Sequence, residues 1–195
     1  MAPYAPARFE YRIWGQVFPE LPSPDQEPVS REVYLLPAEG AEVNVKLRGD
    51  ALEVKRLLGM RAGLQEWLPA LRCPLPLPAA VIEQGLCPAL GAAPPRLRQA
   101  SYPLERFLDE VASALAGVRV VALDKQRRAF EVAGSRAERT RVTVGAVTLE
   151  TVAVEAERFD RAARATDELK LQRARNIDYV TAIRQILAGQ AATDG

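Results

Sequence analysis

Charged residues stand two apart in six short segments of this 195-residue chain. In an extended strand, residues i and i+2 point to the same side, so each segment would present a charged row on one face of a sheet. The six segments are 8–12, 46–48, 53–55, 125–127, 139–141 and 155–157. Most of the rows are basic, and carboxylates join them at places far apart in sequence. Such rows suit a groove or barrel lumen that holds a polyanion together with a metal ion, because Lys and Arg neutralise phosphate and carboxylates bind hard divalent cations.

The same pattern has a simpler interpretation, in which the charged rows are the wet side of an antiparallel sheet. A conventional barrel with an apolar lumen also costs less to build, because its charged side chains keep their hydration. Periodicity alone favours this conventional arrangement. The alternative, with the charges inside, requires the apolar rows to face outward under a cover of helices.

The composition excludes several classes of site. The chain has no histidine, which removes imidazole general bases and histidine-ligated zinc or iron. Its two cysteines, Cys73 and Cys87, are too few for a disulfide framework and lack metal-site spacing. The net charge of +1 gives no bulk basicity for binding nucleic acid. No apolar stretch approaches the ~20 residues that cross a bilayer, so we expect a cytoplasmic protein without a membrane or nucleic-acid partner.

Two proline-rich loops interrupt the first half of the chain. One is predicted over residues 19–28, and a longer one over residues 69–95 with a short helical stretch near 79–84. Residues 31–36 are strand-like, and residues 42–58 predict two strands that turn at Gly49-Asp50.

The second half predicts a helix, a block of strands and two further helices. Apolar residues at helical spacing indicate an amphipathic helix over residues 104–115. The strands that should follow cover residues 118–125, 127–132, 139–144 and 148–157. The last helices are predicted over residues 158–171 and from an N-cap at Asn176 through residue 187. Eight strands suffice to close a barrel with room for a small ligand, and helices at 104–115 and 158–187 would cover its outer face.

The order of the charged pairs resembles that of the CYTH family, the triphosphate tunnel metalloenzymes. The likeness extends over about residues 8–187 and includes the segment 176–180 ahead of the final helix. The matching motifs are Glu10-x-Arg12, Asn44-x-Lys46-x-Arg48, Glu53-x-Lys55, Lys125-x-Arg127, Arg139-x-Arg141 and Glu155-x-Glu157. The resemblance implies a single α+β domain over residues 1–195. It would be an eight-stranded antiparallel β-barrel, or tunnel, with flanking helices and a Pro-rich helical and loop segment at about 60–117.

The resemblance also implies an activity, the cleavage of a terminal phosphoryl group from an inorganic or organic triphosphate with Mg²⁺ or Mn²⁺. Phosphoryl transfer depends mainly on positioning and electrostatics, so the lack of histidine is no obstacle. The implied metal ligands are Glu10, Glu155 and Glu157. The implied phosphate contacts are Arg12, Lys46, Arg48, Lys55, Lys125, Arg127, Arg139 and Arg141. The partner would be a small polyanionic phosphate ligand.

The opening motif departs from the family's Glu-x-Glu-x-Lys. With Arg12 in place of the lysine, Arg8 stands where the first glutamate would be, and Thr143 stands where family members tend to carry an acidic residue. A cation beside the metal and a lost carboxylate both weaken a Mg²⁺ site. Three hypotheses follow: a metal-dependent phosphohydrolase, a non-catalytic module that binds polyphosphate or another phosphorylated ligand, and a scaffold whose charged strands only stay wet. The oligomeric state is left open, with a homodimer among the alternatives.

Overall fold

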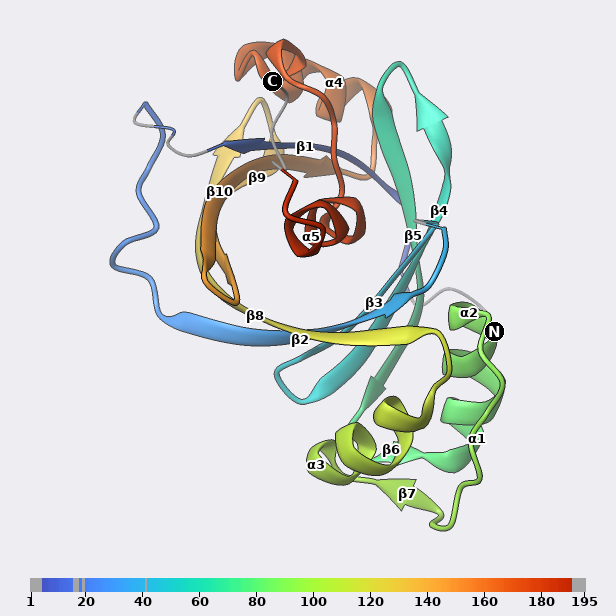
Figure 1. Ribbon diagram of the computed structural model, residues 1–195. Coiled ribbons are helices and arrows are strands. Elements are labelled where there is room, and N and C mark those ends of the chain that lie inside the picture. Colours follow the sequence, from blue (N-terminus) through green and yellow to red (C-terminus); the bar gives the residue numbers. More distant parts are fainter. Residues whose placement is uncertain (1–4, 16–17, 19, 41, 191–195) are drawn as a thin grey trace.

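The computed structural model describes residues 5–15, 18, 20–40 and 42–190. Within them, eight antiparallel strands close into a barrel in the order β1-β10-β9-β8-β2-β3-β4-β5 (Figure 1). These strands are β1 Arg8–Gly15, β2 Val29–Pro37, β3 Val43–Arg48, β4 Ala51–Arg61, β5 Leu64–Pro74, β8 Val118–Val132, β9 Ser135–Val144 and β10 Val147–Ala156. The closed barrel confirms the α+β tunnel fold that the CYTH resemblance implies.

Several strand boundaries differ from the prediction. The turn at Gly49-Asp50 between β3 and β4 is confirmed, but residues 118–132 form one continuous strand rather than two. The chain from residue 69 to residue 74 belongs to β5, where the sequence predicted a loop. Pro69 lies opposite Lys55 at a register shift in the β4–β5 pairing, and an irregularity of this kind tolerates a residue that cannot donate to the ladder. In the first loop, Pro19 lies outside the described residues.

A helical layer formed by residues 79–114 covers one side of the barrel (Figure 1). Ile82, Leu86 and Phe107 are fully buried against the outward-facing Val45 and Leu52. The predicted helix at 104–115 is present as three consecutive helical turns, and the stretch predicted near 79–84 continues to residue 90. The segments are α1 Ala79–Val81, η1 Ile82–Leu86, α2 Cys87–Leu90, α3 Leu104–Arg106, η2 Phe107–Val111 and η3 Ala112–Ala114, with a small sheet of β6 Leu77–Pro78 and β7 Ser101–Tyr102 beneath them.

A second helix, α4 Phe159–Glu168, covers the outer face of β1, β9 and β10. Its Ala162 and Ala165 are fully buried against Ile13, Val152 and Val154. The outward rows of these strands are thus apolar and covered, as the arrangement with charges inside requires. After the short turn η4 Leu171–Arg173, the chain returns toward the barrel.

The last helix, α5 Tyr179–Leu187, lies inside the ring of strands (Figure 1). Val180 and Ile183 are fully buried against the inward-facing Leu123 and Val142. The expectation that residues 158–187 all cover the outer face was therefore wrong for this helix, and the apolar contacts of α5 fill one end of the lumen. Among the described residues, no helix is both long and apolar enough to span a bilayer.

The N-cap of α5 is Asp178, whose carboxylate accepts a hydrogen bond from the Thr181 backbone N–H at 3.0 Å. The predicted cap, Asn176, instead fixes the approach to the helix. Its side chain accepts from the Arg12 backbone N–H at 2.9 Å and donates to the Glu10 carbonyl at 3.0 Å. The asparagine thus ties the segment before α5 to β1, which places the start of the helix in the lumen.

Candidate anion-binding site in the barrel lumen

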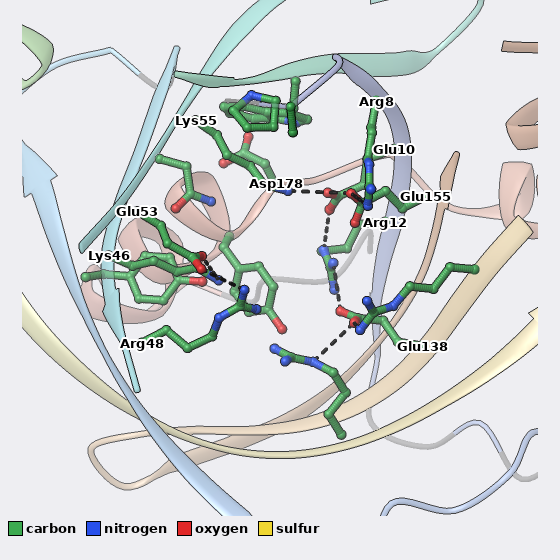
Figure 2. A pocket seen from close by; sticks show the side chains of 18 residues that line it. Arg8, Glu10, Arg12, Lys46, Arg48, Glu53, Lys55, Glu138, Glu155 and Asp178 are labelled. Carbon is green, nitrogen blue, oxygen red and sulfur yellow. Dashed lines mark hydrogen bonds and ion pairs between the residues drawn. The ribbon is translucent and has the colours of Figure 1, made fainter. Parts of the chain in front are cut away.

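The part of the lumen that α5 leaves open is a charged cavity of about 200 Å³ (Figure 2). Seven basic and five acidic side chains line it, so cations are in excess. The charged lining residues are Arg8, Glu10, Arg12, Lys46, Arg48, Glu53, Lys55, Arg127, Arg136, Glu138, Glu155 and Asp178. They come from β1, β3, β4, β8, β9, β10 and the N-cap of α5, and Tyr34, Trp67 and Tyr179 add three aromatic side chains to the wall.

The structure brings most of the predicted phosphate and metal residues together in this cavity. Those that line it are Arg12, Lys46, Arg48, Lys55, Arg127, Glu10 and Glu155. Strand alternation explains the grouping, since each row of residues two apart points to the same face. The charged rows of β1, β3 and β4 therefore face the lumen.

Two predicted residues lie near the cavity without lining it. Lys125 is completely buried, with its Nζ 2.9 Å from a Glu32 carboxylate oxygen and 3.6 Å from the centre of the Tyr179 ring. Glu157 follows the end of β10, and its exposed carboxylate lies 3.7 Å from an Arg8 guanidinium nitrogen. Lys125 thus contacts residues of the cavity wall without being exposed to the cavity, and Glu157 lies beside the cavity.

Arg139 and Arg141 lie on the outer face of the barrel. Both form ion pairs with Glu150, at 2.7 Å and 3.0 Å, and Arg139 donates to the Leu21 carbonyl of the covering loop. On β9 the inward row contains Arg136 and Glu138 and continues into Val142 and Val144, which α5 covers. Because α5 makes this end of the lumen apolar, the valines rather than the arginines point inward. The structure does not place Arg139 or Arg141 where the predicted phosphate contact requires them.

Several residues of the site were missing from the predicted phosphate and metal contacts, among them Glu32, Arg136, Glu138 and Tyr179. Arg136-x-Glu138 has the same two-apart spacing as the other charged pairs, so a strand prediction that began at residue 135 would have included it. Glu32 stands two residues before Tyr34 in the predicted strand 31–36. Tyr179 had no such signal, because only the position of α5 brings it to the lumen.

Glu32 is the centre of a buried ion-pair cluster. Its carboxylate is fully buried and lies 2.9 Å from Lys125, 3.2 Å from Lys46 and 3.3 Å from Arg127. Burial alone would raise the pKa of Glu32, but the three cations outweigh it and hold the pKa well below the usual range. The glutamate is therefore ionised, and it fixes three basic side chains around one point.

Glu138 plays a similar part on β9, which lies on the other side of β8 from the strand of Glu32. Its carboxylate lies 3.1 Å from Arg12 and 3.1 Å from Arg127. Burial by itself raises the pKa of Glu138, whereas Arg12 and Arg127 lower it, and the net result is a pKa of about 2. Arg127, on the strand between them, thus bridges Glu138 and Glu32 and joins the two clusters along the wall.

The low pKa of Glu138 predicts a loss of stability in acid. The unfolded glutamate titrates near 4.5 and the folded one at about 2, so the unfolded chain binds more protons between these values. The contribution of ionised Glu138 to the free energy of unfolding is therefore fully present above about pH 4.5, and it is lost as the pH falls toward 2. We expect the free energy of unfolding, measured with urea at pH 6, 4 and 3, to fall in this window. In a Glu138→Gln variant the free energy of unfolding should fall less over the same pH range. An equal pH dependence in both proteins would contradict the low pKa of Glu138.

The carboxylates of the lumen do not fit a resident Mg²⁺ or Mn²⁺ site. Each acidic side chain implied as a ligand already holds a protein cation, since Glu10 accepts from Arg12 at 2.8 Å and Glu155 from Arg8 at 3.0 Å. Among the described residues, no group of three or more acidic or cysteine side chains is placed to bind a metal ion. A hard cation needs several free oxygen ligands, and here the oxygens are engaged by guanidinium and ammonium groups.

No protein-family model and no curated protein matches this sequence. Two solved structures resemble the chain over nearly its whole length. One, from Bacillus halodurans, is described as a candidate adenylate cyclase; it is 11% identical, with 89% of this chain and 95% of that chain covered and a TM-score of 0.47. The other, from Hippeastrum, is described as a candidate adenylyl cyclase with a dominant triphosphatase activity. It is 11% identical, with 94% of this chain and 96% of that chain covered and a TM-score of 0.44.

Proposed function

We propose that this CYTH-like barrel binds a compact polyphosphate anion, either inorganic triphosphate or the terminal phosphates of an organic triphosphate. The observation that carries the proposal is the lumen cavity with seven basic side chains from opposing walls. Lys and Arg groups on several strands can contact successive phosphate groups of one chain, and guanidinium groups bind phosphate oxygens in pairs. In the scaffold hypothesis the charged rows have no role beyond exposure to solvent, and this does not account for charges directed into a lumen.

The size of the cavity favours a small ligand. Its volume of about 200 Å³ lies below the range of roughly 300–1,000 Å³ typical of pockets that enclose drug-sized molecules. A chain of two or three phosphates is compact and carries most of its charge on oxygens. A nucleoside attached to it would extend out of the cavity.

An unpaired hydroxyl in the wall also supports a ligand. Tyr179 lines the cavity, and its hydroxyl is buried and makes no hydrogen bond among the described residues. Burial raises the pKa of Tyr179 well above its ordinary value, so its hydroxyl remains protonated and can donate. Because an unmade buried hydrogen bond is costly, this donor in the cavity wall is well suited to a phosphate oxygen.

Metal-dependent hydrolysis of the same ligand is the second candidate. Glu155 and Glu138 favour it, since both carboxylates face the cavity. The ion pairs of these side chains with Arg8, Arg12 and Arg127 argue for the binding function instead. We therefore put the non-catalytic polyphosphate-binding module first.

Calorimetric titration with sodium tripolyphosphate in EDTA tests the proposal directly. We expect binding at least about tenfold tighter than that of sulfate, because several cations contact one ligand. Pyrophosphate and ATP are the comparison ligands, and phosphate release with Mg²⁺ or Mn²⁺ is measured in parallel. Absence of both heat and thermal stabilisation by tripolyphosphate would contradict the proposal. Metal-dependent phosphate release that Glu155→Gln abolishes would establish the hydrolase.

A further inference from the structure

Arg8, the first residue of β1, lies between the carboxylates of Glu155 and Glu157 at the end of β10. One of its guanidinium nitrogens lies 3.0 Å from Glu155 and the other 3.7 Å from Glu157. Lys55, from β4, approaches the same Glu155 carboxylate at 3.8 Å. Two fixed cations from different strands thus converge on one acidic group at the cavity wall (Figure 2).

The pairing of β1 with β10 shows why a cation is needed at this point. Glu10 and Glu155 are directly opposite each other in the register, so their side chains point to the same face. Like charges in this position repel. Arg12 neutralises Glu10 at 2.8 Å, and Arg8 neutralises Glu155. Each carboxylate therefore has its own guanidinium, and neither needs an ion from solution.

We infer that Arg8, together with Lys55, supplies beside Glu155 the positive charge that a divalent cation would otherwise supply, so that the lumen binds its phosphate ligand without a metal ion. This inference rests on the proposed polyphosphate-binding function. Arg8 lines the cavity, and its side chain is 37% exposed. A guanidinium has five N–H donors, and the two carboxylates leave some of them available for phosphate oxygens. The site would thus discriminate in favour of the free polyphosphate anion over its metal complex.

A direct measurement of metal binding separates this inference from the proposed function. We would titrate Mn²⁺ into the protein without phosphate and follow free Mn²⁺ by electron paramagnetic resonance. The wild type should bind no Mn²⁺ in the lumen, whereas Arg8→Glu should bind one ion with a dissociation constant below about 1 mM, because four carboxylates would then meet on adjacent strands. The double variant Arg8→Glu/Glu155→Gln should lose this site. Arg128→Glu, with the same charge change on the outer face, is the matched control and should bind none.

The ligand arm uses tripolyphosphate with EDTA and with Mn²⁺. Wild-type affinity should be highest in EDTA and should fall when Mn²⁺ complexes the tripolyphosphate. Arg8→Gln should bind roughly 10- to 100-fold more weakly than the wild type in EDTA, as expected for loss of a charged hydrogen bond. Arg8→Gln adds no acidic group, so it tests the inference even where Arg8→Glu fails to fold. Mn²⁺ binding by the wild type that Glu155→Gln abolishes would overturn the inference, as would tripolyphosphate binding that EDTA removes. If the wild type binds neither Mn²⁺ nor tripolyphosphate, the proposed function fails and the inference falls with it.

Discussion

Replacement of Glu32 by glutamine is expected to lower the free energy of unfolding by about 3–5 kcal/mol, the cost of breaking a buried ion pair from one side. The side chain is fully buried, and Lys125 beside it has no exposed surface at all. Glutamine keeps the shape of the glutamate but removes the charge that Lys46, Lys125 and Arg127 share. Three cations would then remain close together with less compensation. Urea unfolding at pH 7 measures the change.

A second variant shows whether the charge cluster is the cause. Glu32→Gln/Lys125→Met removes the most buried cation together with the carboxylate, so it should be more stable than Glu32→Gln alone. Glu157→Gln, at an exposed carboxylate, should change stability by less than about 0.5 kcal/mol. A loss below about 1 kcal/mol in Glu32→Gln, or a double variant less stable than the single one, would show that the cluster does not hold the barrel as described.

The double variant Arg48→Gln/Arg136→Gln should bind tripolyphosphate at least about 100-fold more weakly than the wild type. Both side chains line the cavity and are partly exposed, at 42% and 55%. Each loss of a charge-assisted hydrogen bond weakens binding by roughly 10-fold or more, and effects at separate sites multiply. Because neither arginine is buried, the fold should tolerate both changes, so that calorimetric titration reports on binding alone.

The matched control removes the same two charges from the outside of the barrel. In Arg128→Gln/Arg141→Gln the side chains pair with Glu27 and Glu150 on the outer surface. This variant has the same net charge as the lumen variant and should bind tripolyphosphate within about twofold of the wild type. Equal losses in the two double variants would mean that binding follows net charge, and would contradict a site in the lumen.

The barrel itself could be predicted from the sequence because its signals are local. Two-residue alternation of charged and apolar side chains marks the strands, and Gly49-Asp50 marks a turn by its backbone requirement. β5 was partly missed because Pro69 normally ends a strand, and only the bulge opposite Lys55 lets it stay. That bulge is a property of the paired strands together and has no signature in either one.

The site was predicted less completely, for a related reason. The inward row of β9 depends on what fills the lumen, and a helix from the far end of the chain fills it. With α5 inside, Val142 and Val144 turn inward, and Arg139 and Arg141 are carried to the outer face. Alternation alone fixes which residues share a face, but the contents of the barrel decide which face is the inner one.

The helix within the lumen also imposes an order on biosynthesis. β1 must find β10 across most of the sequence to close the ring, and contacts of such long range form slowly. Ile177 and the apolar face of α5 leave the ribosome after all eight strands, yet they occupy the inside of the ring. A nascent chain that has completed β10 therefore still exposes an apolar inner wall to water. Burial of that wall must wait for residues beyond 176. The late intermediate with an uncovered wall is the stage at which a chaperone or an aggregating neighbour would meet the chain.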